Sequence, residues 1–222
     1  MLERDEISVK WMKYPDRAAA AQDLISTFSE HLKRVEMVLA IPRGGVVTGA
    51  VIAQRLNLPL DLLLCKKIGH PENSEYAIGS VCADGTRILT DNTSDYHKEH
   101  FERQCLQMET WLKGRYKDLT GRERPADLKN KTVLITDDGL ATGSTMMAAI
   151  RSVRTIGART VIVASPVASE EAASEIRRSA DEFLCPLIPQ EFHAVGQFYS
   201  TFETVTDDQV REIMTGFSSK KI

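Results

Sequence analysis

Residues 132–145 of the chain read TVLITDDGLATGST and place two adjacent acids, Asp137 and Asp138, directly after an apolar run. Neighbouring carboxylates can accept hydrogen bonds from sugar hydroxyl groups, or they can lie beside a cation. A loop of small residues and hydroxyl groups follows the acids and continues into MMAAIRSVR, whose apolar spacing is typical of an amphipathic helix. The pattern therefore predicts acids and hydrogen-bond donors at one junction between a strand and a helix.

The small-residue loop has the properties of an anion-binding site. The backbone N–H groups in the first turn of a helix have no intrahelical partner, and the helix dipole favours negative charge there. Thr142, Ser144 and Thr145 add hydroxyl donors to this loop. Because a phosphate would be repelled by Asp137 and Asp138, we expect these acids to face sugar hydroxyls or a cation. We also expect them to serve the ligand and to carry no packing load.

The composition is that of an ordinary globular protein. The chain has 222 residues, of which 42% are hydrophobic and 27% are charged, which is enough for one good-sized core. Its formal net charge of −3 argues against a nucleic-acid partner. The N-terminal residues lack an apolar signal core and no stretch is long enough to cross a bilayer, so we expect no membrane partner and a cytoplasmic location.

The four cysteines, Cys65, Cys82, Cys105 and Cys185, are far apart in the sequence and form no C-x-x-C pair. Cys65 and Cys185 lie in apolar, strand-like runs. We therefore expect free, buried thiols in a reducing compartment.

Helical and strand-like patterns alternate along the chain. We expect helices over residues 17–33, 45–56, 94–119, 146–154 and 170–179 and from about 207, and strands over residues 35–41, 58–67, 133–135, 160–165 and 183–187. Residues 77–89 are typical of a hairpin that turns at 83–85. Such alternation favours an α/β fold, with a doubly wound, mainly parallel sheet flanked by helices.

The predicted domain organisation is simple. We expect one domain over residues 1–222, with a core from about 33 to 182 and a small hood lobe from about 183 to 206 to which the N-terminus contributes. Residues 68–76 are polar and rich in turn-forming residues, which indicates a mobile loop able to close over a ligand.

Charged residues lie at the ends of three predicted strands. Arg43 with two glycines follows the first strand, the pair Lys66 and Lys67 ends the second, and the two acids follow the third. Glycines allow a close approach of the backbone to a ligand, and Arg43 or a lysine can bind phosphate oxygens. Since ligands of open α/β sheets bind at the carboxyl ends of the strands, we expect a sugar with anionic groups at both ends.

The stretch TVLITDDGLATGST closely resembles the phosphoribosyl pyrophosphate motif of the type I phosphoribosyltransferases. The segments AIPRGG, CKKIGHPENSEYAIGSV and FYSTFETVTDDQV are similar to a group of bacterial phosphoribosyltransferases whose acceptor is not generally assigned. The resemblance implies a type I phosphoribosyltransferase fold. It also implies transfer of 5-phosphoribose from phosphoribosyl pyrophosphate to a nitrogen base, with release of pyrophosphate.

The resemblance assigns roles to residues of this chain. Asp137 and Asp138 would hold the ribose hydroxyls, Arg43 with Gly44 would bind the pyrophosphate, and Lys67, beside Lys66, would come from next to the mobile loop. The phosphoribosyl pyrophosphate site would also include Gly139, Ala141, Thr142, Gly143, Ser144 and Thr145, with the 5-phosphate between Ala141 and Thr145. Mg²⁺ is the implied cofactor, held by phosphoribosyl pyrophosphate and water without a direct protein ligand.

The acceptor base is not assigned by these patterns. Hypoxanthine-guanine enzymes have an aspartate where this chain has Ala141, and the lysine that they use has no counterpart between Phe183 and Tyr199. The segment CPLIPQEFHAVGQFY is similar to the hood of purine enzymes, which makes Phe192 the candidate for stacking on a base. For Phe192 and Tyr199, packing within a small lobe explains the aromatic side chains equally well.

Two classes of function stay open. The first is an enzyme that transfers phosphoribose to a nitrogen base. The second is a regulator that keeps the phosphoribosyl pyrophosphate site as a sensor without robust transferase activity. The absence of a basic face in the sequence favours the enzyme, and a homodimer is compatible with either class.

Overall fold

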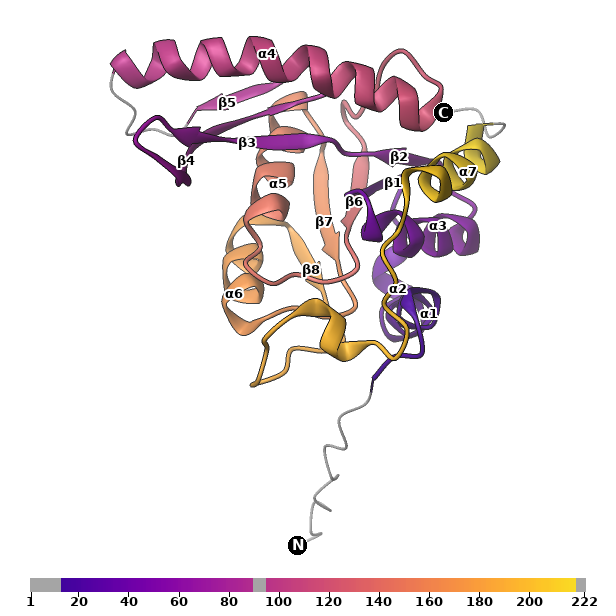
Figure 1. Ribbon diagram of the computed structural model, residues 1–222. Helices are drawn as coiled ribbons and strands as arrows, with labels where there is room; N and C mark the ends of the chain where they lie inside the picture. Colours follow the sequence, from indigo (N-terminus) through magenta and orange to yellow (C-terminus); the bar gives the residue numbers. More distant parts are fainter. Residues whose placement is uncertain (1–12, 90–94, 219–222) are drawn as a thin grey trace, which may run out of the picture.

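A five-stranded parallel sheet forms the centre of the protein (Figure 1). The computed structural model describes residues 13–89 and 95–218. The strands lie in the order β2-β1-β6-β7-β8. Their bounds are Met37–Ala40 for β1, Leu60–Leu62 for β2, Thr132–Thr136 for β6, Thr160–Ala164 for β7 and Glu182–Leu184 for β8. The order confirms the predicted doubly wound sheet, because strands are added in one direction from β1 to β2 and in the other direction from β6 to β8.

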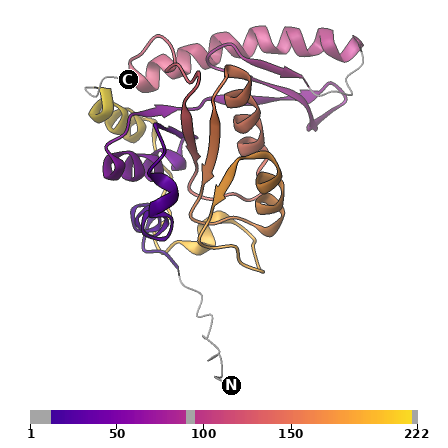
Figure 2. The same ribbon diagram turned by 180° about the vertical axis from the view of Figure 1, so that it is seen from behind.

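Helices cover both faces of the sheet, because its strands are apolar on both sides. Val38, Leu134 and Ile162 pack on one face, and their neighbours Leu39 and Ile135 pack on the other. The views from the front and from behind show the two helix layers (Figures 1 and 2). One layer holds α1 (Arg17–Thr27), α2 (Ser29–Leu32), α3 (Gly44–Leu56) and α7 (Asp207–Ser218), and the other holds α5 (Ser144–Ile156) and α6 (Glu170–Ser179).

A second, antiparallel sheet extends from the core and carries one long helix. This unit, called the arm below, contains β3 (Cys65–His70), β4 (Asn73–Cys82), β5 (Arg87–Leu89) and α4 (Asp95–Thr120). The predicted apolar stripe of α4 packs on the strands through Phe101 and Cys105. A Cβ at Gly79 would meet Phe101 at 2.4 Å, so only glycine lets α4 lie this close to the sheet. Figure 1 shows the arm running across the top of the core and beyond it.

A buried carboxylate fastens the arm to the core. Asp61 of β2 accepts hydrogen bonds from the hydroxyl of Tyr116 at 2.7 Å, from Arg122 at 2.6 Å and from the backbone N–H of Ala126 at 2.8 Å. A buried carboxylate needs such a full set of donors, because an unpaired charge in the interior is very costly. The end of α4 and the connector after it are thereby held against β2.

Three element predictions are wrong in detail. The expected helix over 17–33 is divided at Phe28, and the expected strand over 58–67 is divided into β2 and the first part of β3. The expected loop over 68–76 forms the turn and flanks of the β3–β4 hairpin. Its polar sequence lacks the alternating apolar pattern of a half-buried strand, so the sequence contains no strand signal there.

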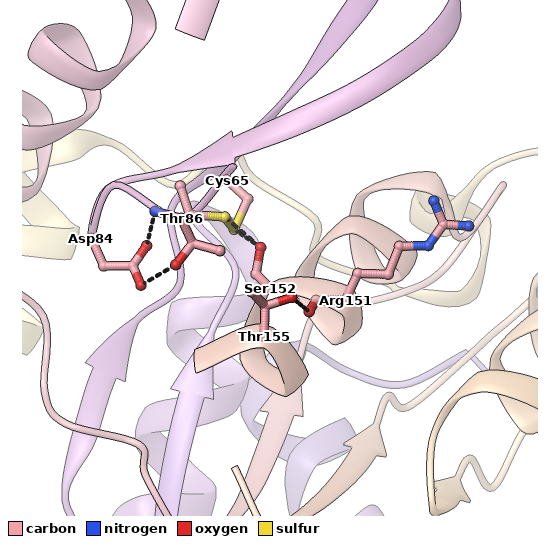
Figure 3. Close-up of a disulfide and its surroundings, with 7 residues drawn as sticks. Cys65, Asp84, Thr86, Arg151, Ser152 and Thr155 are labelled. Carbon is pink, nitrogen blue, oxygen red and sulfur yellow. Dashed lines mark hydrogen bonds between the residues drawn. A yellow bond between two sulfur atoms is a disulfide. The ribbon is translucent and has the colours of Figure 1, made fainter. Parts of the chain in front are cut away.

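The predicted free thiols are also wrong for two of the four cysteines. Cys65 and Cys82 form a disulfide between β3 and β4 (Figure 3). Antiparallel pairing places them directly opposite each other, with Cα atoms 4.1 Å apart, although they are 17 residues apart in the sequence. Ser152 of α5 lies against both sulfur atoms. Cys105 and Cys185 are free, and burial raises the pKa of Cys105 to about 11.

None of the helices within the described ranges combines the length and the apolar character needed to span a bilayer.

The disulfide should stabilise the fold measurably. Closing a loop of this length restricts the unfolded chain by about 2–4 kcal/mol. We expect the double variant Cys65→Ser, Cys82→Ser to lose free energy of unfolding in this range in urea denaturation. Wild-type protein under a strong reductant serves as the control and should unfold at the same urea concentration as the variant. A wild-type midpoint that does not respond to the reductant would contradict the disulfide.

Candidate active site

The two predicted acids lie at the carboxyl end of β6, at the edge where ligands of parallel sheets bind. The Asp137 carboxylate accepts a hydrogen bond at 2.8 Å from the backbone N–H of Asp138. Burial raises the pKa of Asp137 well above its usual range, and the neighbouring Asp138 carboxylate raises it further. Asp137 as a residue is nevertheless partly exposed. The site thus holds an acid that is poorly solvated but accessible.

The start of α3 lies directly on these acids. A Cβ at Gly44 would come within 1.8 Å of Asp138 Oδ2, and one at Gly45 would come within 2.8 Å of Asp137 Cα. Only glycines permit this approach. The preceding Pro42-Arg43 peptide bond is cis. The N-terminal end of α3, with its N–H groups and positive dipole, is therefore placed beside the two acids.

Asp138 forms a buried ion pair that the sequence did not predict. Its Oδ2 accepts a hydrogen bond at 2.7 Å from Nε of Arg17, the first residue of α1, and the two side chains are 13% and 11% exposed. Arg17 also donates to the Glu203 carbonyl at 2.9 Å and lies 3.9 Å from the centre of the Phe202 ring. The expectation that the acids carry no structural load is therefore wrong for Asp138, since it neutralises a buried guanidinium.

The aromatic segment after β8 covers the same edge of the sheet. The Tyr199 hydroxyl donates to the Asp138 carbonyl at 2.5 Å, and the Tyr199 ring stacks on Phe202. The N-terminal segment joins this lobe, because Tyr14 N–H donates to the Phe198 carbonyl at 2.8 Å. The sequence left Phe198, Tyr199 and Phe202 open between base stacking and packing, and it gave no indication of a role for Arg17.

Phe192 lies in an apolar cluster of this lobe, with its ring 5.2 Å from that of Phe198. This is the packing arrangement that the sequence left open. A stacking role for Phe192 stays a prediction. Close by, a Cβ at Gly139 would meet Val195 at 2.3 Å, so the lobe rests directly on the loop that follows the acids.

The loop after the acids, which the sequence predicts to bind an anion, is fixed at its base and exposed at its tip. Its base is held by backbone hydrogen bonds of Leu140 with Val167 and Ser169. The φ of Gly143 is +71°, in the left-handed region that favours glycine, and α5 begins at the next residue. Ala141, Thr142, Ser144 and Thr145 are exposed. The loop is thus fixed from below, and its exposed hydroxyls include those of Thr142 and Ser144, which form a hydrogen bond with each other at 3.2 Å.

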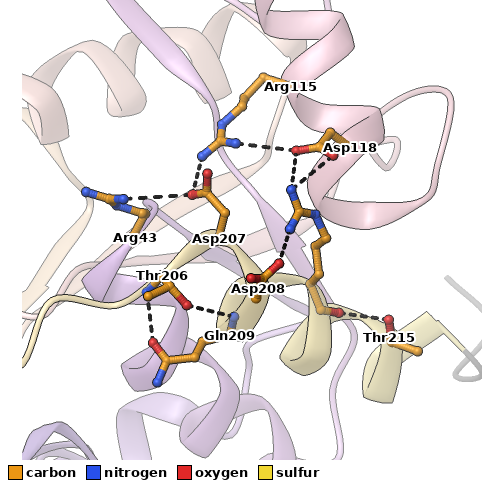
Figure 4. A network of polar contacts seen from close by, with 9 residues as sticks. Arg43, Arg115, Asp118, Thr206, Asp207, Asp208, Gln209 and Thr215 are labelled. Atoms are coloured by element: carbon orange, nitrogen blue, oxygen red, sulfur yellow. Dashed lines mark hydrogen bonds and ion pairs between the residues drawn. The ribbon is translucent and has the colours of Figure 1, made fainter.

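Arg43 lies at the start of α3, but its side chain points toward α7 (Figure 4). Its Nη1 is 3.9 Å from Oδ1 of Asp207, which also forms a close ion pair with Arg115 of α4. Asp207 is a neighbour of the site that the sequence did not single out, because 164 residues separate it from Arg43.

The two predicted lysines lie on the arm. Nζ of Lys66 is 5.2 Å from the centre of the Trp111 ring, so this side chain faces α4. Lys67 is paired in register with Ser80 and, by strand alternation, faces away from Trp111. The structure therefore brings together the acids, Gly44 and the loop after β6, and it leaves Lys66 outside this group.

With two carboxylates, the site suits a cation whose other ligands come from a bound substrate and water. Within residues 13–89 and 95–218 there is no group of three or more His, Cys, Asp or Glu side chains that could hold a metal ion. One oxygen of Asp138 is already taken by Arg17. This donor set fits Mg²⁺ bound mainly by phosphate oxygens, hydroxyls and water, which that ion prefers to an all-protein cage.

Comparison with known proteins agrees with this geometry. The family model for the phosphoribosyl transferase domain matches residues 13–202. Two relatives from Mycobacterium tuberculosis, strains H37Rv and CDC 1551 / Oshkosh, are each 32% identical over 203 residues, or 89% of this chain. Both are provisionally named phosphoribosyl transferases. The chain spans 45% of the length of each relative.

Solved structures show the same fold. The crystal structure of TT1426 from Thermus thermophilus is 35% identical, with a TM-score of 0.86 over 94% of this chain and 100% of that one. A protein from Neisseria gonorrhoeae is 13% identical, with a TM-score of 0.50 over 93% of this chain and 95% of that one, and shares the fold alone. The resemblance found in residues 132–145 is confirmed: the chain belongs to the phosphoribosyl transferase domain family.

Proposed function

We propose that the protein transfers 5-phosphoribose from phosphoribosyl pyrophosphate to a nitrogen base, with Mg²⁺ as cofactor and pyrophosphate as the second product. The observation that carries this proposal is the position of Asp137 and Asp138 between two helix N-termini. The exposed loop before α5 lies after the acids, and the start of α3 lies directly on them. Helix N-termini attract anions, so this arrangement suits a sugar with an anionic group at each end.

Each part of the substrate then has a place. The 5-phosphate would lie in the loop from Ala141 to Thr145, the ribose hydroxyls would donate to the acids, and the pyrophosphate would meet Gly44 and Arg43. Asp137 is the better placed acid for a hydroxyl, because it is the more exposed residue of the two and because Asp138 is held in an ion pair by Arg17. Lys67 of the arm would approach the leaving pyrophosphate if the hairpin closes, as the family resemblance implies.

The chemistry follows from the charges at these positions. Breaking the bond between ribose C1 and the pyrophosphate oxygen leaves positive charge on the ring and negative charge on the leaving group. Carboxylate charge on the two acids would stabilise the ring, and Arg43 would stabilise the leaving group. Mg²⁺, when bound, neutralises further charge on the pyrophosphate. The aromatic lobe over the site would limit attack by water, the competing nucleophile.

The proposal leaves the acceptor as a nitrogen base, without choosing among bases. It includes a cytoplasmic role in nucleotide metabolism without a nucleic-acid partner. A regulator that binds phosphoribosyl pyrophosphate would use the same acids and the same loop. Turnover separates the two functions.

Release of pyrophosphate is therefore the direct test. Purified protein with phosphoribosyl pyrophosphate and Mg²⁺ should release pyrophosphate faster when the right nitrogen heterocycle is added from a panel of nucleobases and related compounds. Calorimetry in the same buffer measures binding alone. Binding without acceptor-dependent release across the panel would favour the regulator, and neither binding nor release would overturn the proposal.

The variant Asp137→Asn should weaken binding of phosphoribosyl pyrophosphate by about 10-fold or more, because a hydrogen bond to a charged acceptor is worth about 1.5–3 kcal/mol. Turnover should fall at least as far, since the charge stabilises the transition state. Calorimetry and initial rates measure the two effects. Glu30→Gln, which removes an exposed acid of α2, is the matched control and should change neither value. Wild-type affinity in Asp137→Asn would remove this acid from the ribose site.

The same variant should make the ligand-free protein more stable. In the unfolded chain Asp137 loses its proton at about pH 4, whereas in the folded protein its raised pKa keeps the proton bound to higher pH. The free energy of unfolding therefore falls as the pH rises above about 4, and it stops falling once the pH has passed the pKa of the folded state. Asparagine keeps the oxygen that accepts from Asp138 N–H but does not titrate. The melting temperatures of variant and wild type should therefore coincide near pH 4 and diverge as the pH rises, by about 2–4 °C per kcal/mol. A difference in the opposite direction at pH 7.5 would contradict the raised pKa.

A further inference from the structure

We propose that Asp207 is the counter-ion of Arg43 and competes with pyrophosphate for its guanidinium group, so that it sets how tightly the pyrophosphate is held. The inference rests on the proposed function in one respect, namely that Arg43 binds pyrophosphate. Asp207 would act through Arg43 and is therefore a positioning residue.

Arg43 is held loosely in the ligand-free protein. Its ion pair with Asp207, at 3.9 Å, is at the long end of such contacts, and 49% of the Arg43 side chain is exposed. Among the described residues, this is the one ion pair that Arg43 makes. A guanidinium group has five N–H donors, so most of its capacity is open to an anion that arrives at the start of α3.

Asp207, in contrast, is held firmly. Arg115 of α4 pairs with Asp207 and with Asp118, which in turn pairs with Arg211 of α7 at 3.0 Å. Arg211 also pairs with Asp208, so that three arginines and three aspartates alternate in one network (Figure 4). The hydrogen bond from Arg115 lowers the pKa of Asp207 below its ordinary value, as expected for a carboxylate bound to a guanidinium group.

The helix start does not use the Asp207 carboxylate. Thr206 and Gln209 cap α7 reciprocally, because the Thr206 hydroxyl accepts from Gln209 N–H at 3.2 Å and the Gln209 side chain accepts from Thr206 N–H at 2.8 Å. The Asp207 side chain is thus left to the two arginines. Its place between Arg43 and Arg115 connects the pyrophosphate position to α4 and hence to the arm.

Removing the negative charge of Asp207 should only increase the affinity for pyrophosphate. Asp207→Asn would free Arg43 from its counter-ion and would also remove a negative charge near an incoming anion. Both effects strengthen binding of pyrophosphate. Neither effect reaches the opposite end of the site, where the loop before α5 would bind the phosphate of a ribose 5-phosphate.

The test is calorimetry with pyrophosphate plus Mg²⁺ and, separately, with ribose 5-phosphate. We expect Asp207→Asn to bind pyrophosphate about 2- to 5-fold more tightly than wild type, as for a partly exposed ion pair, with unchanged affinity for ribose 5-phosphate. Asp208→Asn is the matched control, since it removes the same charge from the same helix but from a residue that pairs with Arg211. Asp207→Glu should restore wild-type affinity. Thermal melts of all variants report the structural cost.

A double-mutant cycle with Arg43→Ala tests whether Asp207 acts on pyrophosphate binding through Arg43. In the Arg43→Ala background, Asp207→Asn should lose most of its effect on pyrophosphate binding. An equal gain in Asp208→Asn, a gain that persists without Arg43, or weaker binding in Asp207→Asn would overturn the inference and leave the proposed function in place. Wild-type protein that binds neither pyrophosphate nor ribose 5-phosphate would overturn both.

Discussion

The site depends on one steric constraint, which is the contact between the start of α3 and the acids that end β6. Gly44 and Gly45 let the start of α3 lie so close to Asp137 and Asp138 that no side chain would fit between them. Since β1 and β6 are neighbours in the sheet, their following segments leave the same edge, one toward each helix layer. The acids are therefore flanked by two helix starts, and the polarity of the whole site follows from that topology.

The second governing feature is that Asp138 serves both the fold and the site. Its ion pair with Arg17 joins α1 to the sheet, and the Tyr199 hydroxyl of the aromatic lobe donates to its carbonyl. A buried charge without a partner is costly, so this acid cannot be removed without disturbing the cover of the site. Asp137 forms no ion pair within residues 13–89 and 95–218, and burial together with the neighbouring Asp138 raises its pKa. The two adjacent acids thus have different roles because their surroundings differ.

The arm is connected to the core by a buried carboxylate and by a network of ion pairs. Asp61 holds the end of α4 against β2, and the Cys65–Cys82 disulfide closes the base of the hairpin beside α5. Arg115 of α4 reaches Asp207 and, through it, Arg43. A ligand that engages Arg43 therefore acts on the same network that contacts the long helix of the arm.

The sequence by itself determined the local parts of this protein, because local patterns follow from near neighbours along the chain. The apolar run, the two acids and the small-residue loop of residues 132–145 indicated strand, loop and helix start correctly, and alternation indicated the parallel sheet. Only the tertiary structure decided the pairings. Arg17 meets Asp138 across 121 residues, and Cys65 meets Cys82 because two strands pair in one register. No periodicity encodes such contacts, since they arise from the packing of elements that are remote in the sequence.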